Sequence, residues 1–223
     1  MKLHIVITHF IEPWEYVWEI YAMCVRALQG HEFQFIVYHR GGEETAWNGQ
    51  VALPPNVEII PLENIGRESY VVHHHICNNY QQLPERLIFI PANWRSREYG
   101  VRHVLQNIRP DGFFPPPAYV PWSSEQFFQL DKWHGLTEVN RSEVIKQEYT
   151  PASIRPYGRW YEVRIPVPYK DLLVLNGVIS IPRQSVLRYP QTMYEDWLLE
   201  LQQSGPNPEI GHYWERTWFS LFS

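Results

Sequence analysis

Leu3-His4-Ile5-Val6-Ile7-Thr8 is a short apolar run rich in β-branched residues, and a helix-compatible segment follows it from about Pro13 to Leu28, before Gly30. Three further apolar runs have the length of buried strands: Phe33–Tyr38, Val57–Ile60 and Leu87–Ile90. A helical pattern from Arg67 to Tyr80 separates the last two. Because strand candidates alternate with helix candidates, we expect an α/β fold in which helices flank a mostly parallel sheet.

Residues 96–223 differ from the first part of the chain in being rich in proline and aromatic residues. Arg109–Pro117 cannot hold a regular helix or a central strand, which indicates a long ordered loop or a boundary. Leu172–Ser180 is interpreted as a strand interrupted at Asn176-Gly177, and two helices are predicted at about Tyr189–Gln203 and Gly211–Phe222. Since the sequence contains no internal repeat, we expect residues 1–223 to form a single domain with an elaborated C-terminal half.

Composition and charge exclude several classes of protein. The chain has 223 residues, of which 44% are hydrophobic, enough for a folded core. A net charge of -5 and the lack of a basic run argue against nucleic acid as a partner. No apolar stretch approaches the ~18 residues that span a bilayer, and the first residues do not resemble a signal peptide. We therefore expect no transmembrane segment and a cytoplasmic location, with Cys24 and Cys77 as core thiols in a reducing compartment.

The aromatic content is high. The chain has 10 Trp, 14 Tyr and 10 Phe, or 15% of its residues. Such side chains bury a large area and keep a polar edge, so they serve either a dense core or a pocket for flat, amphipathic ligands such as sugars and nucleobases. Composition leaves both alternatives open.

Glu63-Asn64-Ile65-Gly66-Arg67-Glu68 lies where the third strand candidate ends and a helix begins. Ligands of open α/β sheets bind at the carboxyl ends of strands, and a helix N-terminus offers free N–H groups to a phosphate. Gly66 permits a tight turn, Arg67 can bind a diphosphate through two hydrogen bonds, and Asn64 or Glu68 can hold a ribose or base edge. The alternative is a helix start with a surface arginine. With one glycine, the segment is neither a P-loop nor a dinucleotide fingerprint.

Two histidine-containing segments have chemical interest. His73-His74-His75 points its side chains about 100° apart on a helix, so it makes a poor metal site, and His75 is predicted to be a packed core histidine. Near the C-terminus, His212, Glu215 and Arg216 lie at helical spacings in an aromatic helix. An imidazole and a carboxylate beside aromatic walls can act as general base and sugar-binding group. The alternative is a closing helix with an internal ion pair.

Several segments, in order along the chain, resemble a known family. They are Leu3–Thr8 with Glu12, Val37–Gly41, Leu62–Glu68 continuing to His74–Pro84, Leu87–Ile90, Asn176–Arg183 with Tyr189–Tyr194, and Gly211–Arg216. Together they resemble the nucleotide-sugar glycosyltransferases of GT-A type found as the N-terminal domain of large chlorella-virus proteins, and a related family of uncharacterised domains. The Asn-x-Gly-Arg-Glu and Gly-His-Tyr-x-Glu-Arg segments are its specific parts.

The resemblance implies a GT-A-like fold that moves a sugar from a nucleoside diphosphate sugar to a glycan or small acceptor. Residues 1–95 would bind the nucleotide, across the ends of the first, third and fourth apolar runs, and residues 96–223 would hold the acceptor. The residues that it implies around the donor are Tyr38 and Arg40 near the base, and Asn64, Arg67 and Glu68 near the ribose and diphosphate. Gly66 in the turn and Asn93 after the fourth run are the further candidates for the donor site. His212 and Glu215 are the candidates for the catalytic base.

The resemblance also implies Mn²⁺ or Mg²⁺ with the donor, held by a carboxylate after the fourth strand. This chain has Pro91-Ala92-Asn93 there, and an Asp-x-Asp pair occurs nowhere in it. The metal ligands are therefore unknown, and the metal requirement stays open. Arg67 with Arg95 or Arg97 would be the cations that neutralise the diphosphate without a metal. The alternative function is a catalytically silent carbohydrate- or nucleotide-binding domain.

Overall fold

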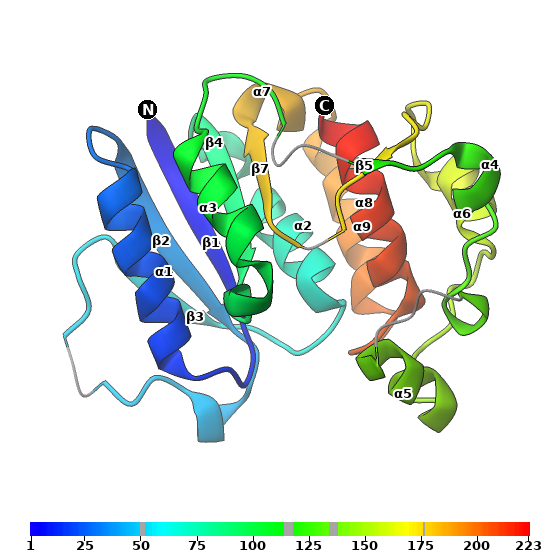
Figure 1. The fold of residues 1–223 in the computed structure, drawn as a ribbon, viewed down its shortest axis with the longest axis horizontal. Coiled ribbons are helices and arrows are strands. Elements are labelled where there is room, and N and C mark those ends of the chain that lie inside the picture. The colour runs from blue at the N-terminus through cyan, green and yellow to red at the C-terminus, as the bar shows by residue number, and fades with distance from the viewer. Residues whose placement is uncertain (50–51, 114–117, 134–137, 176) are drawn as a thin grey trace.

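The structure, a computed structural model, describes residues 1–49, 52–113, 118–133, 138–175 and 177–223. Its centre is a five-stranded sheet in which four neighbouring strands run parallel and one edge strand runs antiparallel (Figure 1). Across the sheet the strands are β3 (Val57–Pro61), β2 (Glu32–His39), β1 (Lys2–His9), β4 (Arg86–Pro91) and the antiparallel β7 (Ile179–Pro182). The mostly parallel sheet expected from the apolar runs is confirmed.

β1 is the central strand, and its position decides where the sheet opens. The chain runs outward from β1 to β2 and β3, then returns to the other side of β1 to form β4. At such a reversal the connections leave neighbouring strand ends in opposite directions, which creates a crevice at the carboxyl ends. Because β2 lies between β1 and β3, the first, third and fourth apolar runs are not consecutive strands. A ligand reaching from β4 to β3 must also pass the end of β2.

Helices cover both faces of the sheet (Figure 1). One layer contains α1 (Trp14–Ala27) and α3 (Glu98–Gln106), and the other contains α2 (Arg67–Asn79), α8 (Gln191–Gln202) and α9 (Glu209–Phe222). Alternate residues of β1 point to opposite layers, since Ile5 and Ile7 pack with α1 and α3 whereas Val6 packs with α2, α8 and α9. Burial on both faces explains why the strand centres carry consecutive apolar residues, such as Ile5, Val6 and Ile7 of β1.

Short elements complete the structure. They are the paired strands β5 (Ala118–Tyr119) and β6 (Leu172–Leu173), the helices α4 (Trp122–Glu125), α5 (Glu138–Lys146), α6 (Tyr157–Arg164) and α7 (Arg183–Val186), and the 3₁₀ turns η1 (Glu43–Thr45), η2 (Tyr80–Gln82), η3 (Trp94–Arg97) and η4 (Leu130–Lys132). The interpretation of Leu172–Ser180 as one interrupted strand is wrong, because its ends join different sheets as β6 and β7. Asn176 and residues 114–117 of the proline-rich segment lie outside the described residues. Within the described ranges, no helix is long and apolar enough to cross a membrane.

Aromatic side chains fill much of the layer formed by α2, α8 and α9. Trp214 is fully buried, and its ring centroid lies 4.3 Å from that of His73 and 5.1 Å from that of Trp160. Much of the aromatic excess therefore serves core packing, the first of the two alternatives. Cys24 and Cys77 are buried free thiols, as predicted, and burial raises the pKa of both.

Replacing Trp214 by alanine is expected to lower the free energy of unfolding by about 3–5 kcal/mol, because a large buried ring is lost and a cavity remains. Tyr99→Ala is the control, since Tyr99 is 83% exposed and its loss should change the stability by no more than about 0.5 kcal/mol. Urea unfolding of both variants measures the difference. Equal stabilities would show that the aromatic layer does not hold the fold together.

Candidate functional site

The turn that leads into α2 brings the Asn-x-Gly-Arg-Glu segment to the carboxyl edge of the sheet. Gly66 has a φ of 63° and donates its N–H to the carbonyl of Gly205 at 2.9 Å. A Cβ at Gly66 would lie 2.6 Å from Cβ of Tyr70, so the position requires glycine in both conformation and space. Arg67 also has a positive φ, 55°. A left-handed residue other than glycine is strained and is often found at a functional site.

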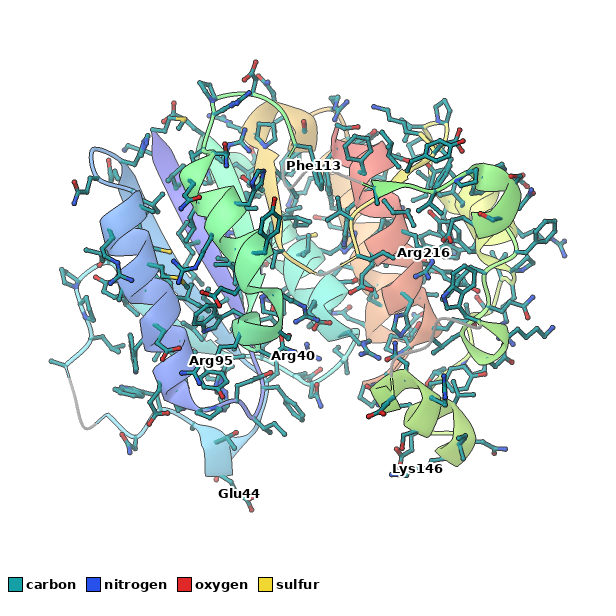
Figure 2. The ribbon with its side chains drawn as sticks, viewed as in Figure 1. Arg40, Glu44, Arg95, Phe113, Lys146 and Arg216 are labelled. Carbon is teal, nitrogen blue, oxygen red and sulfur yellow. The ribbon has the colours of Figure 1, made fainter. Side chains whose placement is uncertain are left out.

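Arg40 follows β2 and lies beneath this turn, at the lower end of the sheet in Figure 2. It is 7% exposed, and its Nη2 donates to Oδ1 of Asn64 at 2.7 Å and to the carbonyl of Ile65 at 3.2 Å. Burial lowers its pKa, and the charge of Glu68 opposes that shift. Among the described residues, none accepts a hydrogen bond from its Nε. Arg40 is thus a buried cation whose Nε–H has no acceptor among the described residues.

Arg67 joins the starts of α2 and α9 to α5. Its Nη1 donates to Oε2 of Glu143 at 3.1 Å and contacts Nε2 of His212 at 3.3 Å. Because a guanidinium only donates, Nε2 of His212 must accept, and the ring proton sits on Nδ1. That Nδ1 faces Oε2 of Glu215 at 3.8 Å. Gly211 makes room for this contact, since a Cβ there would lie 3.3 Å from Cδ of Arg67.

Glu215 carries the negative charge closest to His212 in this cluster. Burial alone would raise its pKa, but the contact with His212 and the charges of Arg67 and Arg216 outweigh burial and lower it. The carboxylate is therefore ionised at neutral pH, and it accepts a proton less readily than an ordinary glutamate. The two predicted catalytic residues do lie together, and Arg67 from the predicted nucleotide site lies with them.

Arg216, the third polar residue of this predicted group, has a different environment. It lies between α9 and α4 (Figure 2), where its Nε donates to Oε2 of Glu125 at 2.8 Å and its guanidinium carbon lies 3.3 Å from the ring centroid of Phe128. Both charged side chains are buried. This ion pair connects two helices, and because both of its side chains are buried it is not open to a ligand. The internal pair of α9 that the sequence suggested as the alternative is present too, between His212 and Glu215.

The residues after β4 do not fit a divalent metal ion. Asn93 offers an amide oxygen that already accepts a hydrogen bond from Nη1 of Arg97. Pro91 and Ala92 are buried and carry no oxygen ligand in their side chains. In the part of the chain that the structure describes, no group of three or more His, Cys, Asp or Glu residues could hold a metal. Mn²⁺ and Mg²⁺ prefer several carboxylate and water oxygens, which this edge does not supply.

The other predicted donor residues lie in different places. Tyr38 is 2% exposed, and its hydroxyl is 3.0 Å from Nδ1 of His75, inside the core between the sheet and α2. His75 also contacts Nδ1 of His4 at 3.0 Å, so its prediction as a packed core histidine is confirmed. Arg95 pairs with Glu19 of α1 on the surface, at 2.5 Å. The structure therefore brings together Arg40, Asn64, Gly66, Arg67, Glu68, His212 and Glu215, and it places Tyr38 and Arg95 elsewhere.

Sequence reasoning missed two features of this edge. Glu143 pairs with Arg67 from 76 residues away, on a helix whose polar sequence gives no hint of the contact. A cavity of about 530 Å³ lies between α1 and the residues after η1, lined by Trp14, Trp18 and Trp47. The four-residue spacing of the first two tryptophans predicts a shared helix face but not a cavity. This cavity keeps the second alternative for the aromatic excess open.

A scan of protein families and a search of curated protein sequences find no match to this chain. Among solved structures, the chain aligns with the galactosyltransferase LgtC in complex with donor and acceptor sugar analogs, at 11% identity over 95% of this chain and 70% of that chain, with a TM-score of 0.36. A structure of an active-site mutant of LgtC aligns at 10% identity over 96% of this chain and 69% of that chain, with a TM-score of 0.38. Because both TM-scores lie below 0.5, these alignments establish neither a fold family nor a function for this chain.

The charges around Glu215 lead to a pH-dependent prediction. Its lowered pKa in the folded protein means that its ionisation stabilises the fold above the unfolded pKa, and that this contribution is lost as pH falls through the folded pKa. Arg67→Ala removes one of the charges that lower the pKa, so the pKa of Glu215 should rise. Carboxyl carbon shifts followed by NMR measure it, with exposed Glu162 as the control that should not move. If the pKa of Glu215 is the same in Arg67→Ala as in the wild-type protein, the charge of Arg67 does not act on Glu215.

Proposed function

We propose that this protein is a glycosyltransferase of GT-A-like architecture that moves a sugar from a nucleoside diphosphate sugar to a glycan or small acceptor. The observation that carries the proposal is that Arg40 and Arg67 flank the turn that opens α2, at the carboxyl edge of a parallel sheet, near enough for their charges to repel. Asn64 and Glu68 lie with them, on the turn that opens α2. This edge is where open α/β sheets bind nucleotides, and two guanidinium groups match the charge of a diphosphate.

The two arginines would act on the leaving group. In the transfer, the bond between the anomeric carbon and the diphosphate oxygen breaks while an acceptor hydroxyl forms a bond to that carbon. The diphosphate leaves with the electron pair, so its stabilisation by fixed cations lowers the barrier. Arg40 has a free Nε–H for this purpose among its described contacts. Arg67 is held by Glu143 until a phosphate oxygen replaces that carboxylate.

The acceptor hydroxyl must lose its proton, and Glu215 is the proposed base. It is ionised, partly exposed, and close enough to Arg67 to lie beside the departing diphosphate. His212 orients it from Nδ1, while Nε2 of the same ring is occupied by Arg67. A general base contributes typically about 10²–10⁴-fold to the rate. Asn64 and Glu68 would hold the ribose or the base edge of the donor.

A catalytically silent nucleotide- or carbohydrate-binding domain is the second candidate. The observation that favours it is the low proton affinity of Glu215, whose pKa lies below the ordinary value. The residues after β4, which do not fit a metal ion, are consistent with the same alternative. Incubation of the protein with donor sugars of several bases, with and without Mn²⁺, separates the two candidates. Release of the nucleoside diphosphate supports the enzyme, and binding without release supports the silent domain.

Arg67→Ala is expected to weaken binding of a nucleoside diphosphate by about 1.5–3 kcal/mol, or roughly 10- to 150-fold, the usual range for hydrogen bonds to charged groups. Glu143→Gln should act in the opposite direction, because it removes the carboxylate that competes with the phosphate for Arg67. Calorimetry measures both affinities. Arg102→Ala, on the exposed face of α3, is the matched control. Equal affinity in a folded Arg67→Ala protein would place the nucleotide elsewhere.

Glu215→Gln keeps the shape of the side chain and removes the proton acceptor. If Glu215 is the base, turnover should fall by about 10²–10⁴-fold while donor affinity stays within a few-fold of wild type. Thermal unfolding of Glu215→Gln and of the wild-type protein shows whether the variant is less stable because the contact with His212 is lost. A catalytic defect leaves the unfolding temperature unchanged. Glu162→Gln, at an exposed position of α6, controls for the change in net charge. Wild-type turnover in a stable Glu215→Gln protein would remove Glu215 from the mechanism.

A further inference from the structure

His9 and His39 form a buried pair outside the arginine cluster. They end β1 and β2, are 0% and 5% exposed, and face the layer of α1. The two Nδ1 atoms lie 2.8 Å apart, which is hydrogen-bond distance. The ring of Trp14 stacks on that of His9, with centroids 4.2 Å apart.

The outer nitrogens of both rings fix the number of protons. Nε2 of His9 lies 2.8 Å from the carbonyl of Glu12, and Nε2 of His39 lies 2.8 Å from the carbonyl of Gly42. A carbonyl oxygen only accepts, so each Nε2 must carry a proton. Two neutral imidazoles have one ring proton each, and both are now used. The short contact between the Nδ1 atoms would then bring two lone pairs together, unless a third proton lies between them.

We propose that His9 and His39 share one added proton, so that the pair is a buried monocation that fastens the β1–α1 connection to the β2–η1 connection. The shared proton supplies the third hydrogen bond, and no second added proton can be accommodated because each nitrogen is then used. Gly41 shows how closely the two connections are packed, since a Cβ there would lie 2.0 Å from the carbonyl oxygen of Phe10 and 2.9 Å from Cε1 of His39.

The surroundings of the pair act on its charge in both directions. Burial and the charge of His39 lower the pKa of His9, and they outweigh the opposite effects of the bond to the Glu12 carbonyl and of the Glu12 charge. Trp14 offers an aromatic face to His9, which suits a cationic ring. From η1, Thr45 presents a neutral hydroxyl 3.5 Å from Nε2 of His39. Arg40, next in sequence, turns its guanidinium to Asn64.

A metal ion is the other group that could satisfy two converging lone pairs. At the usual Zn–N distance of 2.0–2.1 Å, nitrogens 2.8 Å apart would subtend about 85° at the metal, well below the tetrahedral angle. The ion would also need further ligands. Among the described residues, no third His, Cys, Asp or Glu joins the pair to form a metal-binding group. The geometry therefore favours the proton.

The shared proton gives stability a distinctive pH profile. Unfolded, the two histidines titrate near pH 6.5 and bind two protons below it and none above it, whereas the folded pair holds one throughout this range. As the pH increases towards 6.5, the folding equilibrium constant should therefore rise by up to tenfold per pH unit. As the pH increases further, it should fall by up to tenfold per pH unit. A neutral pair would give the rise alone. The fall on the alkaline side is the signature of the shared proton.

The test compares the whole protein with His39→Asn, whose amide N–H can bond to Nδ1 of His9 without an added proton. Urea unfolding between pH 5 and 9 measures the free energy of unfolding of both proteins. It should decrease above pH 6.5 in the wild-type protein, and this decrease should be absent from His39→Asn. Imidazole nitrogen shifts measured by NMR should give three N–H protons for the pair at pH 7. His74→Asn, at a half-exposed position of α2, is the matched control and should keep the alkaline fall.

Two outcomes would overturn the proposal. One is a wild-type profile with no alkaline fall, together with nitrogen shifts of two neutral rings at pH 7. The other is stoichiometric binding of Zn²⁺ that His39→Asn abolishes, which would make the pair part of a metal site. If His39→Asn does not fold, the nitrogen shifts of the wild-type protein decide the question alone.

Discussion

The pairing of β1 with β2 on one side and β4 on the other is the constraint on which the remaining structure depends. Once β1 is central, the carboxyl ends of four parallel strands lie along one edge, and the connections after them must pass over it. Polar side chains gather in those connections and at the last residues of the strands. His9, Arg40 and Asn93 each follow or end a strand at this edge, and α2 starts there after β3.

Charge neutralisation organises the part of this edge beside α9. Arg67 is placed by a left-handed backbone conformation and is then surrounded by carboxylates from α2, α5 and α9. A cation in such a position is stable only while acidic groups remain close, and a phosphate can take the place of one of them. The charge of Arg67 is also one of the causes that lower the pKa of Glu215, after the contact with His212. Under the proposed function, binding of an anion to Arg67 would therefore be coupled to the basicity of Glu215.

The aromatic residues divide into two groups with different physical roles. Those of α9 and α6 are buried with His73 and Tyr194 and give the C-terminal half its core. Trp14, Trp18 and Trp47 instead line a cavity on the other side of the sheet, next to the histidine pair. A dense aromatic core fixes α9 against α2, and that packing positions His212 and Glu215 near Arg67.

Local periodicity and backbone conformation were enough to predict the parallel strands, the long helices α1, α2, α8 and α9, and the turn at Gly66. The sequence also predicted Arg67, Glu68, His212 and Glu215 as site residues. Which of these side chains lie in contact depends on the folding of the whole chain. The separation of Leu172–Ser180 into two sheets, the burial of Tyr38 and the pairing of Arg67 with Glu143 depend on contacts between residues far apart in the chain. Such contacts leave no periodic pattern, since packing and charge compensation act through space and not along the sequence.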